Sequence, residues 1–211
     1  MHHTTGLVLK KDEWKETDLL ITALTRDFGK IRFLVQGARK HGAKLQGHIE
    51  PGSVSELSFV ASRNGYRLTA AELLRFFPGT RDYWPGTAAV QFVLRILEDN
   101  LWEERDNAAV LFETTCEILS RLGDGGGNSL SLRRALVWYQ VKFLNLLGVL
   151  PSSQSQEASF FRDLISLNSL PLEAAEDLDV SVLEAELTRL VNLLGSAVRI
   201  PPYVAPADSF V

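Results

Sequence analysis

The sequence predicts an α+β chain in which a five-stranded β-barrel precedes an all-α domain. Two observations predict this order. Apolar residues alternate with polar ones in the first part of the chain, and beyond residue 79 they recur at helical spacing. The charge balance changes at the same place: residues 1–75 carry 12 lysines and arginines against 8 acidic residues, whereas residues 76–211 carry 10 against 18. We therefore predict one domain at residues 1–77 and a second at residues 78–211.

Five short strands are expected in the first domain, each marked by an alternating or apolar run. The run at residues 19–24 could also form a helical turn, but the turn Asp27–Lys30 that follows it favours a strand. Five strands in so few residues suit a closed barrel, because closure removes exposed strand edges, and the oligonucleotide-binding (OB) barrel is the common five-stranded form. The expected strands contain residues 7–10, 19–24, 31–35, 54–61 and 66–70.

The last two strands carry two further signals. Val54 is out of phase with Leu57 and Phe59, so a β-bulge is expected near Ser55–Glu56. Asn64–Gly65 lies between two alternating runs, and this dipeptide favours a type I′ turn because both of its residues tolerate positive φ. The fourth and fifth strands are therefore expected to form a bulged hairpin.

The second domain is expected to contain four longer helices and one short helix. Residues 123–128 are rich in glycine and form the predicted link between the second and third helices. Ser181 and Glu184 form a capping-box pattern that opens the last helix, and Gly195 ends it. The helices are expected around residues 89–101, 111–122, 132–147, 160–167 and 183–194, followed by an extended tail that contains prolines.

No catalytic motif is present in the sequence. The histidines stand in no metalloprotease or deaminase pattern, and the glycines at 125–127 lack the lysine and hydroxyl residue of a phosphate-binding loop. The single cysteine, Cys116, can form neither an intramolecular disulfide nor a thiolate zinc site. No apolar run is long enough to span a bilayer, and the first residues do not read as a secretory signal. We expect a cytoplasmic protein that is not an enzyme and takes no cofactor, metal, membrane or small-molecule substrate.

The segment Gly37–Lys44 is the strongest candidate for a functional site. It places three cations and a histidine among glycines that let the backbone approach a ligand. Such a patch can neutralise phosphates and release counterions, which is the main sequence-independent contribution to nucleic-acid affinity. The alternative is a loop that is merely solvated. The predicted DNA-binding residues are Arg39, Lys40 and Lys44 in the loop, with Lys30, Arg32, Lys10 and Lys11 extending the patch.

Four aromatic residues of the first domain are candidates for stacking on nucleobases. They are Trp14, Phe28, Phe33 and Tyr66. The alternative is that these rings fill the barrel, and for Phe33 the barrel interior is the expected place.

Several of these segments resemble the RecO family of DNA repair proteins. Their order and spacing match the family's N-terminal OB domain over about residues 5–75, and a later helix has the family's Leu-x-x-x-Gly-x-x-Pro ending. The segments that carry the resemblance are Gly6–Leu9, Glu16–Leu20, Leu24–Lys30, Val35–Lys40, Leu68–Glu72 and Phe143–Pro151.

The resemblance implies a recombination mediator that binds single- and double-stranded DNA and anneals complementary strands. It implies two partners, RecR and the tail of the single-stranded-DNA-binding protein, so that RecA can load. Within the Gly-Ala-Arg motif, Arg39 and Lys40 are then the best candidates for phosphate contacts, without base specificity.

The sequence departs from the family in two respects. Many members follow the helix ending with a four-cysteine zinc module, whereas here Pro151 is followed by Ser152–Ser155, so a zinc-free variant is expected. The helical half is also acidic, which leaves the barrel as the expected DNA surface. The second hypothesis is a protein–protein adaptor of the same fold with little DNA affinity, in which the acidic half is the working surface.

Overall fold

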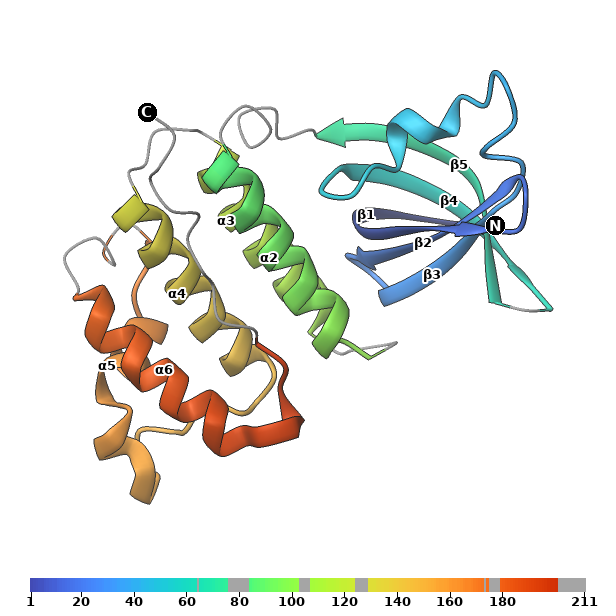
Figure 1. The fold of residues 1–211 in the computed structure, drawn as a ribbon. Helices are drawn as coiled ribbons and strands as arrows, with labels where there is room; N and C mark the ends of the chain where they lie inside the picture. The colour runs from blue at the N-terminus through green and yellow to red at the C-terminus, as the bar shows by residue number, and fades with distance from the viewer. Residues whose placement is uncertain are drawn as a thin grey trace. The chain divides into compact units, whose positions relative to one another are not determined.

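The computed structural model describes residues 1–63, 65–75, 84–102, 107–123, 129–172, 174 and 179–200. The N-terminal part forms five strands, and helices follow it, as predicted (Figure 1). Each strand contains the run of residues that predicted it, including the ambiguous run at residues 19–24. The strands are β1 (His2–Trp14), β2 (Asp18–Thr25), β3 (Gly29–Val35), β4 (Val54–Ser62) and β5 (Gly65–Arg75).

The five strands form a closed barrel in the order β1-β2-β3-β5-β4, with β4 returning to β1. All pairings are antiparallel except that of β3 with β5, where Phe33 lies opposite Tyr66. Every second residue points inward, so a continuous apolar core fills the barrel, as a period of two requires. This closed five-stranded arrangement confirms the OB-fold prediction.

The hairpin of β4 and β5 is bulged, and the register shifts between Val54 and Ser55, next to the predicted position. Gly65 already belongs to β5 and pairs with Ser62, so it lies one position later in the hairpin than predicted. The other half of the predicted turn signal, Asn64, lies outside the described residues. A further irregularity between Val8 and Lys10 lets the long β1 pair with β2 and β4 in succession.

The helical elements agree with the predicted order. The short predicted helix begins slightly later than expected, after a turn of 3₁₀ helix. The predicted glycine-rich link began at residue 123, but Gly123 is the last residue of α3. Residues 124–128 of that link, the predicted domain boundary between residues 77 and 78, and most of the proline-containing tail lie outside the described residues. No described helix is long and apolar enough to cross a membrane. The elements are α2 (Trp84–Asn100), α3 (Ala108–Gly123), α4 (Ser129–Leu146), η2 (Gln156–Phe160), α5 (Arg162–Asn168), α6 (Val180–Leu194) and η4 (Gly195–Ala197), with η1 (Leu45–His48) between β3 and β4.

The predicted capping box of the last helix is wrong. Asp179, not Ser181, is the N-cap of α6, and its carboxylate accepts the Ser181 N–H at 2.9 Å. An aspartate two residues earlier provides an equally good acceptor with extended backbone, so the helix begins there. Glu184, the expected second half of the box, instead accepts hydrogen bonds from Arg133. Gly195 ends the helix with a positive φ of 56°, as predicted.

The chain divides into two compact units. The barrel unit comprises Met1–Pro78 together with Leu94–Glu113, and the helical unit comprises Gly79–Val93 and Thr114–Val211. Within the barrel unit, Leu7 and Leu24 are buried although neither belongs to the barrel's interior cluster. Both faces of β1 and β2 therefore carry buried apolar side chains.

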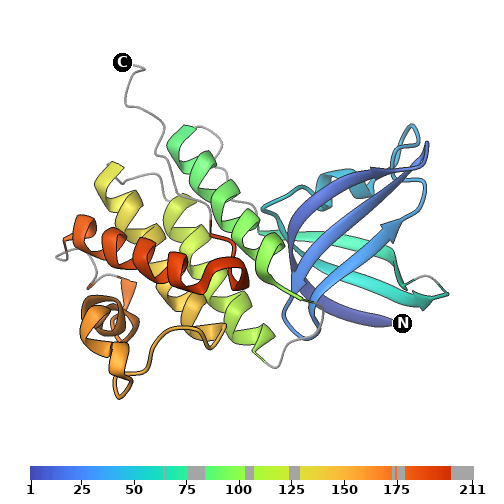
Figure 2. The same cartoon turned by 60° about the horizontal axis from the view of Figure 1, so that its bottom comes forward.

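The core of the helical unit centres on α4. Tyr139 is fully buried, shares a hydrogen bond of 3.1 Å with the Thr115 hydroxyl, and lies 6.2 Å from the Phe143 ring. Burial raises the pKa of Tyr139 above its usual value, so the phenol remains neutral. Figure 2 shows α4, α5 and α6 packed beside one another, and Trp138 on α4 donates its indole N–H to the Leu170 carbonyl at 3.0 Å.

Candidate nucleic-acid interface

The basic loop, residues 37–44, follows β3 and consists of two successive tight turns. Gly37 accepts the Lys40 N–H at 3.1 Å, and Lys40 in turn accepts the Ala43 N–H at 3.1 Å. Gly37 and Gly42 both have positive φ, 66° and 80°, which side chains rarely tolerate. These glycines therefore shape the loop that carries the three predicted cations.

The start of this loop is anchored by Thr17 in the β1–β2 turn and by Asp18, the first residue of β2. The Asp18 carboxylate accepts the Gly37 N–H at 2.8 Å, and the Thr17 carbonyl accepts the Arg39 N–H at 2.9 Å. Between these bonds, Ala38 is buried in the barrel core, and its carbonyl accepts the Gln46 side chain at 2.8 Å. The loop is thus ordered against the barrel. Asp18 and Thr17 were missed as site residues in the sequence, although both stand in the family-like segment Glu16–Leu20.

The carboxylate of Asp18 is stabilised in its charged form. Its pKa is lowered, chiefly because it accepts the Gly37 N–H. Burial opposes this shift and is the second-largest effect, while the Thr17 hydroxyl and the charges of Lys15 and Lys40 lower the pKa further.

Three of the seven predicted residues are exposed cations without an ion-pair partner. They are Lys40 and Lys44 in the basic loop and Arg32 on the outer face of β3. Within the described part of the chain, no carboxylate lies at ion-pair distance from any of the three. We refer to Lys40, Lys44 and Arg32 as the unpaired cations.

Three others form ion pairs within the barrel unit. Arg39, the best candidate by resemblance, contacts Glu13 at 3.0 Å. Lys10 contacts Asp12 at 3.0 Å, and Lys11 contacts Glu50 at 2.6 Å. We refer to Arg39, Lys10 and Lys11 as the paired cations. A phosphate must compete with a neighbouring carboxylate for each of them.

The structure does not place Lys30 on the DNA-facing surface predicted for it. Its side chain is only 8% exposed, and its ammonium donates to the Glu98 and Leu101 carbonyls at 2.5 and 3.1 Å. The Glu98 carboxylate lies 3.5 Å away. The cation therefore satisfies the last carbonyls of α2, where a positive charge is favoured, and it has no free donor surface for DNA.

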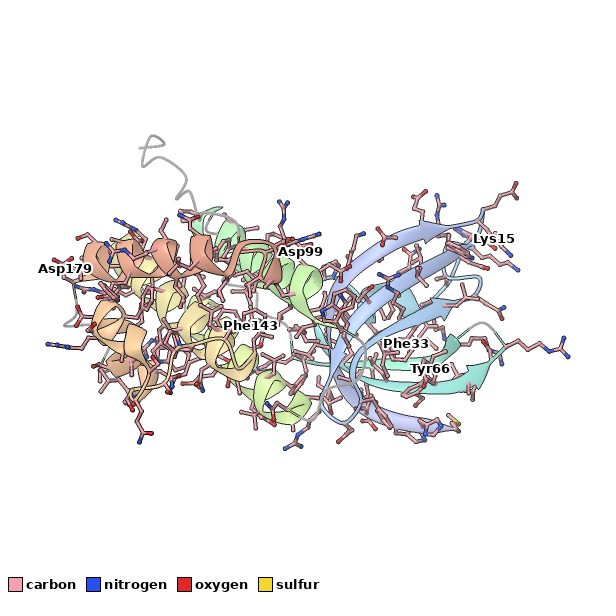
Figure 3. All side chains as sticks on the ribbon, turned by 90° about the horizontal axis from the view of Figure 1, so that it is seen from below. Lys15, Phe33, Tyr66, Asp99, Phe143 and Asp179 are labelled. Atoms are coloured by element: carbon pink, nitrogen blue, oxygen red, sulfur yellow. The ribbon has the colours of Figure 1, made fainter. Side chains whose placement is uncertain are left out.

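Further cations outside the predicted set lie on the same domain, and two of them, Lys15 and Arg67, stand near residues of the basic loop or next to it. Lys15 stands in the β1–β2 turn with a φ of 56° and is exposed. Figure 3 shows its side chain at the end of the strands, away from Phe33 and Tyr66. Arg67 on β5 is exposed and contacts the Gln36 side-chain oxygen at 3.3 Å. Lys15 adjoins the basic loop through the anchoring residues, a proximity that sequence separation hides.

The four aromatic candidates differ in exposure and in position on the barrel. Trp14, at the end of β1 beside Lys15, is 48% exposed. Phe33 is fully buried, as expected. Phe28 and Tyr66 are partly exposed, but their rings pack against buried Phe59 at 5.5 and 5.4 Å, so they cover one end of the core. Trp14 is therefore the aromatic side chain that combines exposure with closeness to the basic loop.

The described residues contain no group of three or more histidine, cysteine, aspartate or glutamate side chains that could hold a metal ion. Cys116 is half-buried on α3 and forms no disulfide. The family's four-cysteine zinc site does not fit this chain, since the sequence has one cysteine.

Comparison with known proteins gives consistent matches. Residues 1–77 match the family model described as recombination protein O N terminal. The chain is 30% identical over 154 residues to DNA repair protein RecO of Nostoc sp. (strain PCC 7120), covering 72% of this chain and 52% of that protein. It is 25% identical over 199 residues to DNA repair protein RecO of Syntrophomonas wolfei, and this match covers 90% of this chain and 77% of that protein. It is 37% identical over 99 residues to DNA repair protein RecO of Gloeobacter violaceus, and this match covers 46% of this chain and 38% of that protein. The chain thus spans about half the length of most relatives it matches.

Proposed function

This chain belongs to the RecO family of DNA repair proteins, and we propose that it acts in recombinational repair by binding DNA through its barrel, without catalysis. The observation that carries the proposal is the basic loop, which presents Lys40 and Lys44 unpaired among the described residues and is ordered by Asp18 and Thr17. An ordered loop of free cations binds phosphate with little further loss of conformational entropy.

The proposed binding is electrostatic and independent of base sequence. Lysine ammonium groups contact phosphates as point charges, and each contact releases a condensed counterion. Single- and double-stranded DNA both present such phosphates, so both are proposed ligands. Trp14 adds a stacking surface that only unpaired bases can use.

The finer roles are also proposals and rest on the family. A cationic surface that neutralises two strands reduces their repulsion, which would support strand annealing. We propose RecR and the tail of the single-stranded-DNA-binding protein as partners in RecA loading. We also propose that the protein works without zinc, and elemental analysis of the purified protein checks this directly.

A second candidate function is a protein–protein adaptor of the same fold. Two observations favour it: four of the seven predicted cations lie at ion-pair distance from carboxylates, and residues 76–211 carry 10 basic against 18 acidic residues. In that case the acidic half would contact a basic protein surface, and DNA affinity would be weak.

Salt-dependent DNA binding distinguishes the two functions. We expect the fluorescence anisotropy of labelled single- and double-stranded oligonucleotides to rise when this protein is added at about micromolar concentrations in low salt. The binding should weaken as the salt concentration rises. An annealing assay with complementary strands, with and without RecR, tests the finer role. Absence of binding at low salt would overturn the DNA-binding proposal and leave the adaptor.

A further inference from the structure

We propose that Asp18 is a positioning residue for DNA binding: its carboxylate holds the basic loop in the shape that presents Lys40 and Lys44. This inference rests on the proposed function. By this proposal an acidic residue favours the binding of a polyanion, whereas charge alone predicts that it opposes this binding.

The Asp18 carboxylate accepts two hydrogen bonds, one of them from the basic loop. The Asp18 carboxylate accepts the Gly37 N–H at 2.8 Å and the Thr17 hydroxyl at 3.1 Å. Gly37 is the first residue of the turn that Lys40 closes, since Lys40 donates its N–H to the Gly37 carbonyl at 3.1 Å. The carboxylate therefore fixes the peptide from which the turn begins.

The Lys40 side chain lies beside the same glycine. A Cβ atom placed on Gly37 would lie 3.5 Å from Cδ of Lys40, so the lysine's aliphatic carbons pass directly beside this glycine. Gly37 also has a φ of 66°, one of several conformations that glycine adopts readily, so the hydrogen bond to Asp18 helps to select this one. If the Gly37 N–H lost its acceptor, both the turn and the direction of Lys40 would become less defined.

The rest of the anchor does not depend on Asp18. Thr17 accepts the Arg39 N–H through its backbone carbonyl, and Ala38 is held in the barrel core. Replacement of Asp18 is therefore expected to leave the barrel folded and to loosen the start of the loop. The lowered pKa of Asp18 agrees with this role, because the carboxylate is charged at neutral pH and accepts strongly.

Positioning and charge predict opposite results for one substitution. Asp18→Ala removes a negative charge beside the proposed phosphate contacts, so electrostatics alone predicts tighter binding. If Asp18 positions the loop, DNA binding at low salt should instead become about fivefold weaker, because the binding-competent loop is then only partly populated. Asp18→Asn removes the same charge but retains an oxygen acceptor for Gly37, and it should bind at least as tightly as the wild type.

A matched control is Asp12→Ala. Asp12 lies on β1 and contacts only exposed Lys10 among the interactions described, so its removal changes the charge without affecting the loop anchor. It should bind DNA slightly more tightly than the wild type. Thermal unfolding of all variants checks that the barrel remains folded.

The experiment combines anisotropy titrations of labelled single-stranded DNA with NMR hydrogen exchange of the Gly37 amide in the free protein. The expected result is weaker binding and faster Gly37 exchange in Asp18→Ala, with both restored in Asp18→Asn. If the wild type binds and Asp18→Ala binds equally or more tightly, the positioning role is wrong while the proposed function stands. If the wild type does not bind, the proposed function fails and this inference fails with it, whatever the amide exchange shows.

Discussion

The helical unit and the basic loop use their charged side chains differently. In the helical unit, the Arg133 guanidinium donates two hydrogen bonds to the Glu184 carboxylate, and the Lys142 ammonium donates to the Asn168 carbonyl at 2.5 Å. Burial lowers the pKa of Lys142. In the basic loop, Lys40 and Lys44 lie in water without such partners among the described residues.

Some charged side chains therefore belong to the fold, and others are available to a ligand. A cation that already contacts a carboxylate or carbonyl stabilises its own unit, and a ligand must displace that partner. A solvated cation contributes little to the stability of the fold, and it gives up no protein partner when it binds a phosphate. The comparison therefore predicts that helical-unit substitutions change stability and that loop substitutions change binding.

The largest effect is expected in the core of the helical unit. Phe143→Ala removes a fully buried ring packed on Tyr139 and should lower the free energy of unfolding by about 3–5 kcal/mol. Denaturant titration measures this loss. Leu193→Ala on α6 is the control, because that side chain is 69% exposed and should cost less than about 0.5 kcal/mol. Equal losses would mean that the core does not centre on α4.

The next effect separates two cations on the same face of one strand. Lys30→Met keeps the aliphatic chain but leaves the Glu98 carboxylate and two carbonyls without their donor, so it should cost about 2 kcal/mol of stability. Arg32→Met, two residues along β3, should change stability by less than about 0.5 kcal/mol. Thermal and denaturant unfolding measure both variants. Similar small losses would show that Lys30 is not structural.

A third prediction concerns the form of DNA that is bound. Trp14→Ala should weaken single-stranded DNA binding by about tenfold, because stacking on an exposed ring stabilises unpaired bases. Double-stranded binding should change far less, and Trp14→Phe should retain most of the single-strand affinity. Parallel anisotropy titrations with both forms of DNA make the comparison. An equal loss for both forms would assign Trp14 to the fold of the β1–β2 turn.

The smallest effect tests competition between a carboxylate and phosphate. Glu13→Gln removes the partner of Arg39 and should tighten DNA binding by about twofold, since a paired cation becomes available. Glu16→Gln removes the same charge from the neighbouring turn without freeing Arg39, so its effect should be smaller. Titrations at one low salt concentration measure both. Equal effects would mean that only net charge matters.

Local patterns predicted much of the fold. The period-two runs gave five strands, and helical spacing with its glycine stops gave the helices in order, because these signals come from side chains a few residues apart. The start of the last helix was missed, since Asp179 and Ser181 are both good N-caps and the sequence alone does not decide between them.

The candidate site was predicted only in part. A dense run of cations marked the basic loop, but the paired and unpaired cations could not be separated from sequence. The Glu13–Arg39 contact depends on how the β1–β2 hairpin meets a loop distant in the sequence. Lys30 meets partners 68 and 71 residues away, at the end of a helix. Such pairings are set by tertiary structure, on which a local pattern carries no information.

The decisive measurement compares two double variants of equal charge change. Lys40→Ala with Lys44→Ala removes two unpaired cations, and Lys10→Ala with Lys11→Ala removes two paired ones. Anisotropy titrations of single-stranded DNA across several salt concentrations give the affinity and its salt slope. We expect the loop variant to bind about tenfold more weakly at low salt, with a slope reduced by about 1.5, and the paired variant to change much less. Equal losses in the two variants would contradict the claim that freedom from an ion-pair partner decides where this protein binds DNA.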